Sequence, residues 1–174
     1  MAANDIYVER LARWGTWDSA TNMADIQDLT FQEIARGARV AAQVGGTAEQ
    51  GQGPPLIIVQ GHFEFATAPV IDENVQVWLA AYGPNNDEPP NSLIASTAAQ
   101  RTNLNELFGC KFAGQGRVAT VVAADNVGFT ATLEWPYPHI QPLVFNNSAA
   151  DNLVNTASLS WVRIWHAIMR RQTS

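Results

Sequence analysis

The sequence predicts an all-β protein, an antiparallel β-sandwich or barrel of about eight strands. Short segments of apolar and polar residues in alternation recur along the chain, and loops rich in Gly, Pro and Asn separate them. The 174 residues are the size of one domain, and 47% of them are hydrophobic, enough for a core without disulfide or metal. We divide the chain into an N-terminal arm, residues 1–24, and one domain, residues 25–174, with room for one short helix.

The N-terminal segment, Ala2–Trp17, predicts a short amphipathic helix that Gly15 ends. The residues near one side of this helix are Ile6, Tyr7, Leu11 and Trp14. Two interpretations stay open: the segment docks on its own domain, or it is an arm that reaches a neighbouring subunit or a membrane. Trp14 and Trp17 are costly to leave in water, so we expect something to cover them.

The segment Asp25–Val44 fits two structures. Its first half has helical spacing, whereas its second half alternates and favours a strand that ends at Gly45-Gly46. Thr47–Pro55 is rich in Gly and Gln and closes with two prolines, which predicts a surface loop.

The clearest strand signals are Leu56–Phe65 and Val75–Tyr82. In the first, Phe63 and Phe65 share one face, and Gly61 suggests a bulge. We expect these two strands to be antiparallel neighbours.

The middle of the chain contains several short predicted elements. Gly83–Asn91 is a loop by composition, Leu93–Ala95 a brief strand, and Thr97–Phe108 a short helix. Gly114-Gln115-Gly116 is expected to be a turn. Arg117–Ala124 and Phe129–Trp135 are predicted strands, which residues 125–128 join as a hairpin.

The C-terminal third combines a proline-rich segment with a bulky strand. Trp135–Pro142 contains three prolines and therefore should not be a central strand, since proline lacks the backbone donor. Leu159–Met169 alternates with large residues on both faces, which predicts a strand that is covered on both sides.

No recognisable catalytic or cofactor motif occurs. His62, His139 and His166 are too far apart in the sequence for a zinc signature, and Cys110 is the single cysteine, expected to be a small buried residue. No nucleotide-binding or hydrolase glycine motif is present. His62 and Glu64 share one strand face, which leaves a barrel enzyme as a minor hypothesis. We expect no enzyme activity, no cofactor and no metal.

The charge composition argues against nucleic acid as a partner. The net charge is −6 and Lys111 is the single lysine, so no basic cluster beyond Arg170-Arg171 is available to bind nucleic acid. Only 15% of residues are charged, and such a neutral surface suits coverage by another protein. The first residues lack the features of a signal peptide, and no apolar run is long enough to span a bilayer, so we expect a soluble product made in the cytoplasm.

The aromatic residues carry the site hypotheses. The segment Trp135–His139 is either an anchor between subunits, a platform on which sugars stack, or core filling. The candidate interface residues are Trp14, Trp17, Trp135, Tyr137, Trp161, Trp165, Arg170 and Arg171.

These features together resemble a viral capsid subunit of the single jelly-roll class. The segments behind the resemblance are Leu56–Phe65, Val75–Tyr82, Trp135–Asn147 and Leu159–Arg171. The size and acidity are most similar to the small major capsid proteins of tailless, internal-membrane double-stranded DNA phages and archaeal viruses, the sphaerolipovirus-like group.

The resemblance implies a jelly-roll barrel that assembles with copies of itself into an icosahedral shell. It also implies a second capsid protein as a partner, an inner face against a membrane, and a virion location after synthesis in the host cytoplasm. No family residue transfers as a site. The alternative function is a carbohydrate-binding, lectin-like β-sandwich that uses Trp135, Tyr137 or Trp78.

Overall fold

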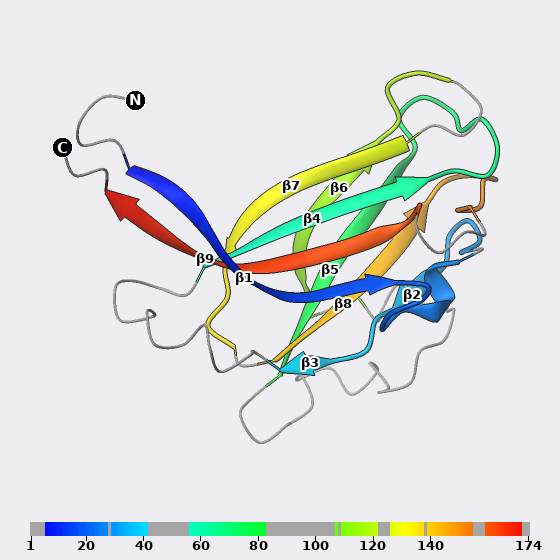
Figure 1. The fold of residues 1–174 in the computed structure, drawn as a ribbon. Coiled ribbons are helices and arrows are strands. Elements are labelled where there is room, and N and C mark those ends of the chain that lie inside the picture. Colours follow the sequence, from blue (N-terminus) through cyan, green and yellow to red (C-terminus); the bar gives the residue numbers. More distant parts are fainter. Residues whose placement is uncertain are drawn as a thin grey trace.

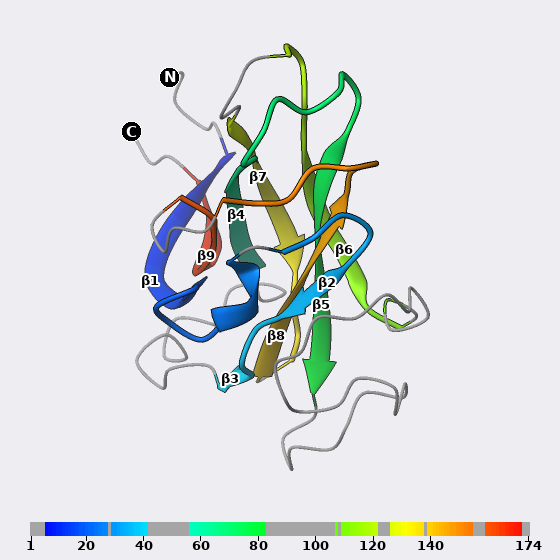
Figure 2. The ribbon, with the colours of Figure 1, turned by 90° about the vertical axis from the view of Figure 1, so that its right-hand side faces the viewer.

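The protein is a sandwich of two antiparallel β-sheets (Figure 1). The structure is a computed structural model that describes residues 6–27, 29–41, 56–82, 107, 109–121, 126–137, 139–154 and 159–171. Figure 2 shows the molecule turned by 90° from the view of Figure 1, so that the two sheets appear as two layers side by side. Within the described residues, no helix is long and apolar enough to cross a membrane.

The first sheet has the strand order β1-β9-β4-β7. Its members are β1 (Ile6–Asp18), β9 (Trp161–Arg171), β4 (Leu56–Glu64) and β7 (Asn126–Glu134). The 13-residue β1 forms one edge of this sheet and pairs with β9 along its whole length.

The second sheet has the order β2-β8-β5-β6, with β3 also paired to β8. Its members are β2 (Ile34–Arg36), β3 (Val40–Ala41), β8 (His139–Asn147), β5 (Asn74–Tyr82) and β6 (Lys111–Arg117). The only helix in the described residues is η1, a 3-10 turn at Ala24–Ile26.

The strand order is that of a jelly roll. Because β2 and β3 pair with successive parts of β8, they occupy one strand position and leave eight positions in all. Numbered along the chain, the first strand then pairs with the eighth, the second with the seventh, the third with the sixth and the fourth with the fifth. A long hairpin wrapped into two packed sheets has this pairing, so the predicted jelly-roll sandwich is confirmed.

Side chains from the facing sides of both sheets form the core. Alternate residues of each strand point inward, which is the two-residue period of an extended chain. The core residues contributed by the long strands are Ile57, Val59, Phe63, Val75, Val77, Leu79, Ile140, Val144, Val162 and Ile164.

The predicted N-terminal helix is wrong, because Ile6–Asp18 is strand β1. Two register shifts in its pairing with β9, around Arg13, change which residues face inward. Trp14 and Trp17 therefore both point into the core, although they are three residues apart. The residues that we set apart as an arm thus contribute an edge strand of the sandwich.

In the next segment, a strand in the second half of Asp25–Val44 is found at Val40–Ala41, and residues 42–44 lie outside the described part.

Several predicted neighbours belong to opposite sheets. β4 and β5 do not pair, since β4 lies between β7 and β9, and β5 lies between β6 and β8. The hairpin over residues 125–128 is wrong for the same reason: β6 and β7 lie in different sheets. The strand predicted at Arg117–Ala124 is wrong over its described residues, because β6 ends at Arg117 and residues 118–121 lie outside any strand. β6 contains Gly114-Gln115-Gly116, so the turn predicted there is wrong as well.

Gly61 was misjudged, and the structure shows the reason. Gly61 marks no bulge, because β4 keeps its register with both neighbours; a Cβ there would lie 2.5 Å from Cε1 of Phe129. The ring of Phe129 fills the space that this glycine leaves, so packing explains Gly61.

Proline is accommodated in the central strand β8, against expectation. The carbonyl oxygen of Pro142 accepts a hydrogen bond from Gly37 N, in the gap between β2 and β3. In an antiparallel sheet the backbone N and O of one residue point to the same neighbouring strand. The N–H that Pro142 lacks would therefore point into the gap between β2 and β3, where the regular strand pairing is already interrupted.

The predictions for Thr47–Pro55, Gly83–Asn91 and Leu93–Ala95 lie outside the described residues, as does most of Thr97–Phe108.

Candidate assembly surfaces

The exposed large apolar side chains gather at two opposite ends of the sandwich. Among the described residues there are ten such side chains, and eight of them fall into two groups. The ribbon patch consists of Ile6, Tyr7, Val8 and Met169. The loop patch consists of Phe31, Val70, Ile71 and Val121. Single exposed apolar residues are common on proteins, but groups of them mark interaction surfaces.

The ribbon patch lies where β1 begins and β9 ends (Figure 1). β9 pairs with β4 as far as Ala167 opposite Leu56. From Ile168 onward its only partner among the described residues is β1, so the two strands continue as a two-stranded ribbon beyond the sheet. Its apolar residues are 39% to 70% exposed.

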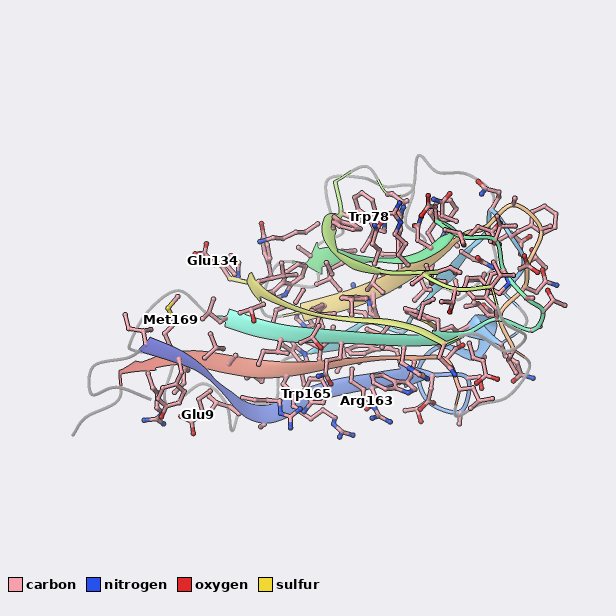
Figure 3. The ribbon with its side chains drawn as sticks, turned by 90° about the horizontal axis from the view of Figure 1, so that it is seen from above. Glu9, Trp78, Glu134, Arg163, Trp165 and Met169 are labelled. Atoms are coloured by element: carbon pink, nitrogen blue, oxygen red, sulfur yellow. The ribbon has the colours of Figure 1, made fainter. Side chains whose placement is uncertain are left out.

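The two faces of this ribbon differ. Val8 lies directly opposite Met169, so these side chains share one face with Ile6. Tyr7 lies on the other face opposite Arg170, which forms an ion pair with Glu9. Figure 3 shows Glu9 and Met169 on opposite sides of the ribbon.

The loop patch lies at the far end, where the turn between β4 and β5 meets the segments after β6 and β8 and before β2. Val118 N donates to Glu73 O at 2.8 Å, which holds the strand end before Val121 against the Val70–Glu73 turn. Gln32 donates its side-chain amide to Ser148 O, and Ala149 N donates to Glu73 Oε1 at 2.7 Å. These bonds link the segment of Phe31 to that of Val70, so the four apolar residues, 46% to 61% exposed, share one end.

Tryptophan and arginine cover the outer face of the first sheet. The guanidinium carbons of Arg10 and Arg13 lie 4.8 and 5.5 Å from the ring centre of Trp165, and that ring is only 6% exposed. Trp161 has His62 stacked on it at 5.4 Å and Arg163 at 3.9 Å. Figure 3 shows Trp165 and Arg163 on the side of the first sheet that faces away from the second. Both indole rings are thus occupied by groups of the same chain.

The outer face of the second sheet carries a more open aromatic pair. Trp78, which projects from that sheet in Figure 3, meets Phe112 edge-on at 5.0 Å. Its indole N–H donates to Gln76 Oε1 at 3.0 Å, and the Gln76 amide donates in turn to Asn74. Phe112 is 43% exposed, so this aromatic and amide row is accessible from one side.

Three of the tryptophans proposed as interface residues lie in the core of this chain. Trp14, Trp17 and Trp135 are buried, and each indole N–H donates to a backbone carbonyl, those of Val40, Ala38 and His139 respectively. We therefore drop all three as anchors of a partner. The covering that we expected for the N-terminal tryptophans comes from the sandwich itself.

The other proposed residues lie at or near the surface. Tyr137 is 45% exposed and touches Trp135 edge-on, Trp161 and Trp165 lie on the outer face of β9, and Arg170 belongs to the ribbon. The backbone of Arg171 is the last residue of β9, whereas its side chain lies outside the described part.

In the part of the chain that the structure describes, no group of three or more His, Cys, Asp or Glu side chains lies close enough to hold a metal ion. His62 stacks on Trp161 instead of pairing with Glu64. Cys110 is half-buried and packs beside the apolar cluster around Leu143.

The pKa of His166 departs from its ordinary value because of where the side chain lies. It lies on the inner face of β9 and stacks on Trp14 with ring centres 4.6 Å apart. Burial lowers the pKa of His166 below 6.5, because the charged imidazolium would lose its hydration there. Its Nε2 is buried and has no hydrogen-bond partner, which also favours the neutral imidazole.

Comparison with known proteins gives little to build on. No protein-family model and no curated protein matches this chain. Among solved structures, the CBM22-1 xylan-binding domain of Paenibacillus barcinonensis Xyn10C matches at a TM-score of 0.29 and 11% identity, covering 100% of this chain and 99% of that one. A structure of infectious bursal disease virus, Gt strain, matches at 0.20 and 12% identity, covering 95% of this chain and 41% of that one. Scores this low carry no argument about function.

Sequence reasoning missed both patches, although weak signals were present. Ile6 and Val8 alternate with polar neighbours as in a strand, but the helical interpretation hid this. Val70-Ile71 is an apolar pair in a turn between Pro69 and Asp72, where polar residues are the norm.

Proposed function

We propose that this chain is a structural capsid subunit, without enzymatic activity, that assembles with copies of itself into a virion shell. The observation that carries the proposal is that, among the described residues, eight of the ten exposed large apolar side chains gather into two end patches. Jelly rolls serve both as capsid subunits and as lectins, so the fold alone does not decide between them. A second capsid protein and a membrane on the inner face remain part of the proposal through the family resemblance.

The outer face of the first sheet favours assembly over sugar binding. Sugar stacking requires an open aromatic ring face, and the rings of Trp165 and Trp161 already hold arginine and histidine groups of this chain. Planar aromatic and arginine groups are also the residue types enriched at protein interfaces.

The test is the mass of the purified full chain in solution, measured by size-exclusion chromatography with light scattering over a wide range of concentrations. We expect a mass above the 18.9 kDa of one chain that grows with concentration, and ordered particles in electron micrographs of the largest fraction. A mass of one chain at every concentration and salt would overturn the proposal.

A matched pair of variants shows whether the apolar surface causes the association. Val8→Glu with Met169→Glu places charge on the ribbon patch, and we expect this variant to be monomeric. Phe112→Ser is the control, because Phe112 is similarly exposed but lies outside both patches. Loss of association in the control together with normal association of the ribbon variant would contradict the role of the patch.

The second candidate function is carbohydrate binding on the outer face of the second sheet. The half-open Trp78–Phe112 pair beside the Asn74–Gln76 amide row favours it, since such rows combine a stacking surface with hydrogen-bonding groups. Neutral glycans on an array, probed with the wild-type chain and with Phe112→Ala, test this function. Binding that Phe112→Ala abolishes would support it, whereas the absence of binding by the wild type would end it.

A further inference from the structure

We propose that the two patches bind each other, so that the ribbon of one copy docks on the loop end of the next copy in a head-to-tail chain of contacts. This inference rests on the proposed function and names the surfaces that meet. The partner is a second copy of this chain, because both mating surfaces are present on every copy, at opposite ends of the sandwich (Figure 1).

The two patches are similar in size and chemistry. The ribbon presents three large apolar side chains on one face, those of Ile6, Val8 and Met169, while Tyr7 lies on its other face. The exposed fractions overlap, at 41% to 70% for these three and 46% to 61% for the four side chains of the loop patch. A repeating end-to-end contact removes both groups from water at once. A contact of one patch with its own counterpart on a twofold-related copy would leave the other patch exposed on every copy.

The charges beside the two patches are opposite. Residues 6–10 and 167–171 of the ribbon contain three arginines and one glutamate. The segments that carry the loop patch contain four carboxylates in the described residues and one arginine, Arg117, which pairs with Asp72 at 2.9 Å. The four carboxylates are those of Glu33, Asp72, Glu73 and Asp151, of which Asp151 is buried and the other three are at least partly exposed. Copies meeting ribbon to ribbon would bring like charges together, whereas ribbon to loop end brings opposite charges together.

Head-to-tail contacts have a consequence that self-pairing contacts lack. Because the two surfaces differ, each added copy exposes a fresh surface, and the assembly continues until a ring closes or a filament grows. The competing arrangement is pairing of β1 with β1 of a twofold-related copy along the free sheet edge, which stops at a dimer. The experiment separates the two.

The experiment mixes two variants of the full chain, each disabled at one end. The ribbon variant is Val8→Glu with Met169→Glu, and the loop variant is Val70→Glu with Ile71→Glu. All four positions are 41% to 61% exposed, so the fold should survive, which circular dichroism and the melting temperature check. Negative charge at both disabled ends prevents them from binding each other. If a glutamate variant fails to fold, the same positions are replaced by serine and the experiment is repeated with the serine variants.

We expect each variant alone to be monomeric by sedimentation velocity. An equimolar mixture should form a one-to-one complex of twice 18.9 kDa and nothing larger, because one intact ribbon meets one intact loop end. A loop variant that still associates like the wild type would overturn the inference, as the edge-paired dimer predicts. A mixture that stays monomeric would overturn it as well. A wild-type chain that is monomeric throughout would instead overturn the proposed function, so the two failures are distinguishable.

Discussion

The interior of the sandwich and its two ends use apolar residues in different ways. Between the sheets, the tryptophan side chains are buried and their indole N–H groups are bonded to backbone carbonyls. At the ends, side chains such as Ile6 and Val70 are more than half exposed, and the fold of one copy does not cover them. The difference teaches that the stability of the single chain depends on the interior, whereas its association depends on the ends. Substitutions should therefore separate the two properties.

The largest effect on stability is expected at Trp17. Its ring is fully buried, and its N–H donates to Ala38 O at 2.7 Å. Trp17→Ala should lower the free energy of unfolding by about 3–5 kcal/mol, since it removes a large ring and leaves a cavity. Urea unfolding at a concentration where the chain is monomeric measures this. The ribbon substitution Val8→Glu is the control and should change the stability of the monomer by less than about 0.5 kcal/mol. Similar losses of unfolding free energy in both variants would contradict the view that the interior and not the ends stabilises the single chain.

A moderate effect is expected where glycine makes room for a ring. A Cβ at Gly61 would lie 2.5 Å from Phe129 and 2.8 Å from Phe63, so Gly61→Ala should cost about 1–3 kcal/mol of stability by overpacking. Adding Phe129→Leu should recover part of this loss, because the smaller side chain leaves room for the methyl group. The double variant measured beside both single variants checks the coupling. Additive losses would show that the two positions do not compete for space.

The interior should also respond to pH through His166. Because burial lowers its pKa in the folded state, the unfolded chain binds this proton more readily. The neutral imidazole then contributes its full stability above pH 6.5, and this contribution is lost as the pH falls from there towards the lower pKa of the folded state. Urea midpoints measured from pH 8 to pH 5 test this, with His166→Phe as the comparison. The same dependence on pH in both proteins would assign the effect to other groups.

The smallest effect is expected at the surface ion pair of the loop end. Arg117 and Asp72 lie 2.9 Å apart with side chains 60% and 67% exposed. Arg117→Ala should lower the stability of the monomer by less than about 0.5 kcal/mol, since water and salt screen such pairs. Thermal unfolding of the dilute chain checks this. A loss above 1 kcal/mol would mean that the loop end contributes to folding as the interior does.

The fold class was predictable because the apolar alternation of the long strands is a local signal. Leu56–Glu64 and Trp161–Arg171 each show it within their own residues. Strand partners were not predictable, since β4 pairs with residues about 60 to 110 positions later and no local pattern encodes this. The strand β1 escaped because its two register shifts disturb the alternation that would have revealed it.

The candidate site was less predictable than the fold. Tryptophan is equally suited to a core and to an interface, and the sequence does not say which side of a strand another sheet covers. Trp17 and Trp165 illustrate this, because one is enclosed between the sheets and the other lies beneath two arginines on an outer face. The exposed patches depend on where the ribbon leaves the sheet and where four separate segments meet, which only the folded chain defines.

Amide hydrogen exchange at two protein concentrations tests most directly whether the two ends are contact surfaces. The exchange of each peptide is compared between a dilute sample, in which the chain is monomeric, and a concentrated one. We predict slower exchange on concentration at residues 6–9 and 168–171 of the ribbon and at residues 70–73 and 118–121 of the loop end, with the core strands unchanged. Exchange at both ends that is independent of concentration, in a sample shown to associate, would contradict the account.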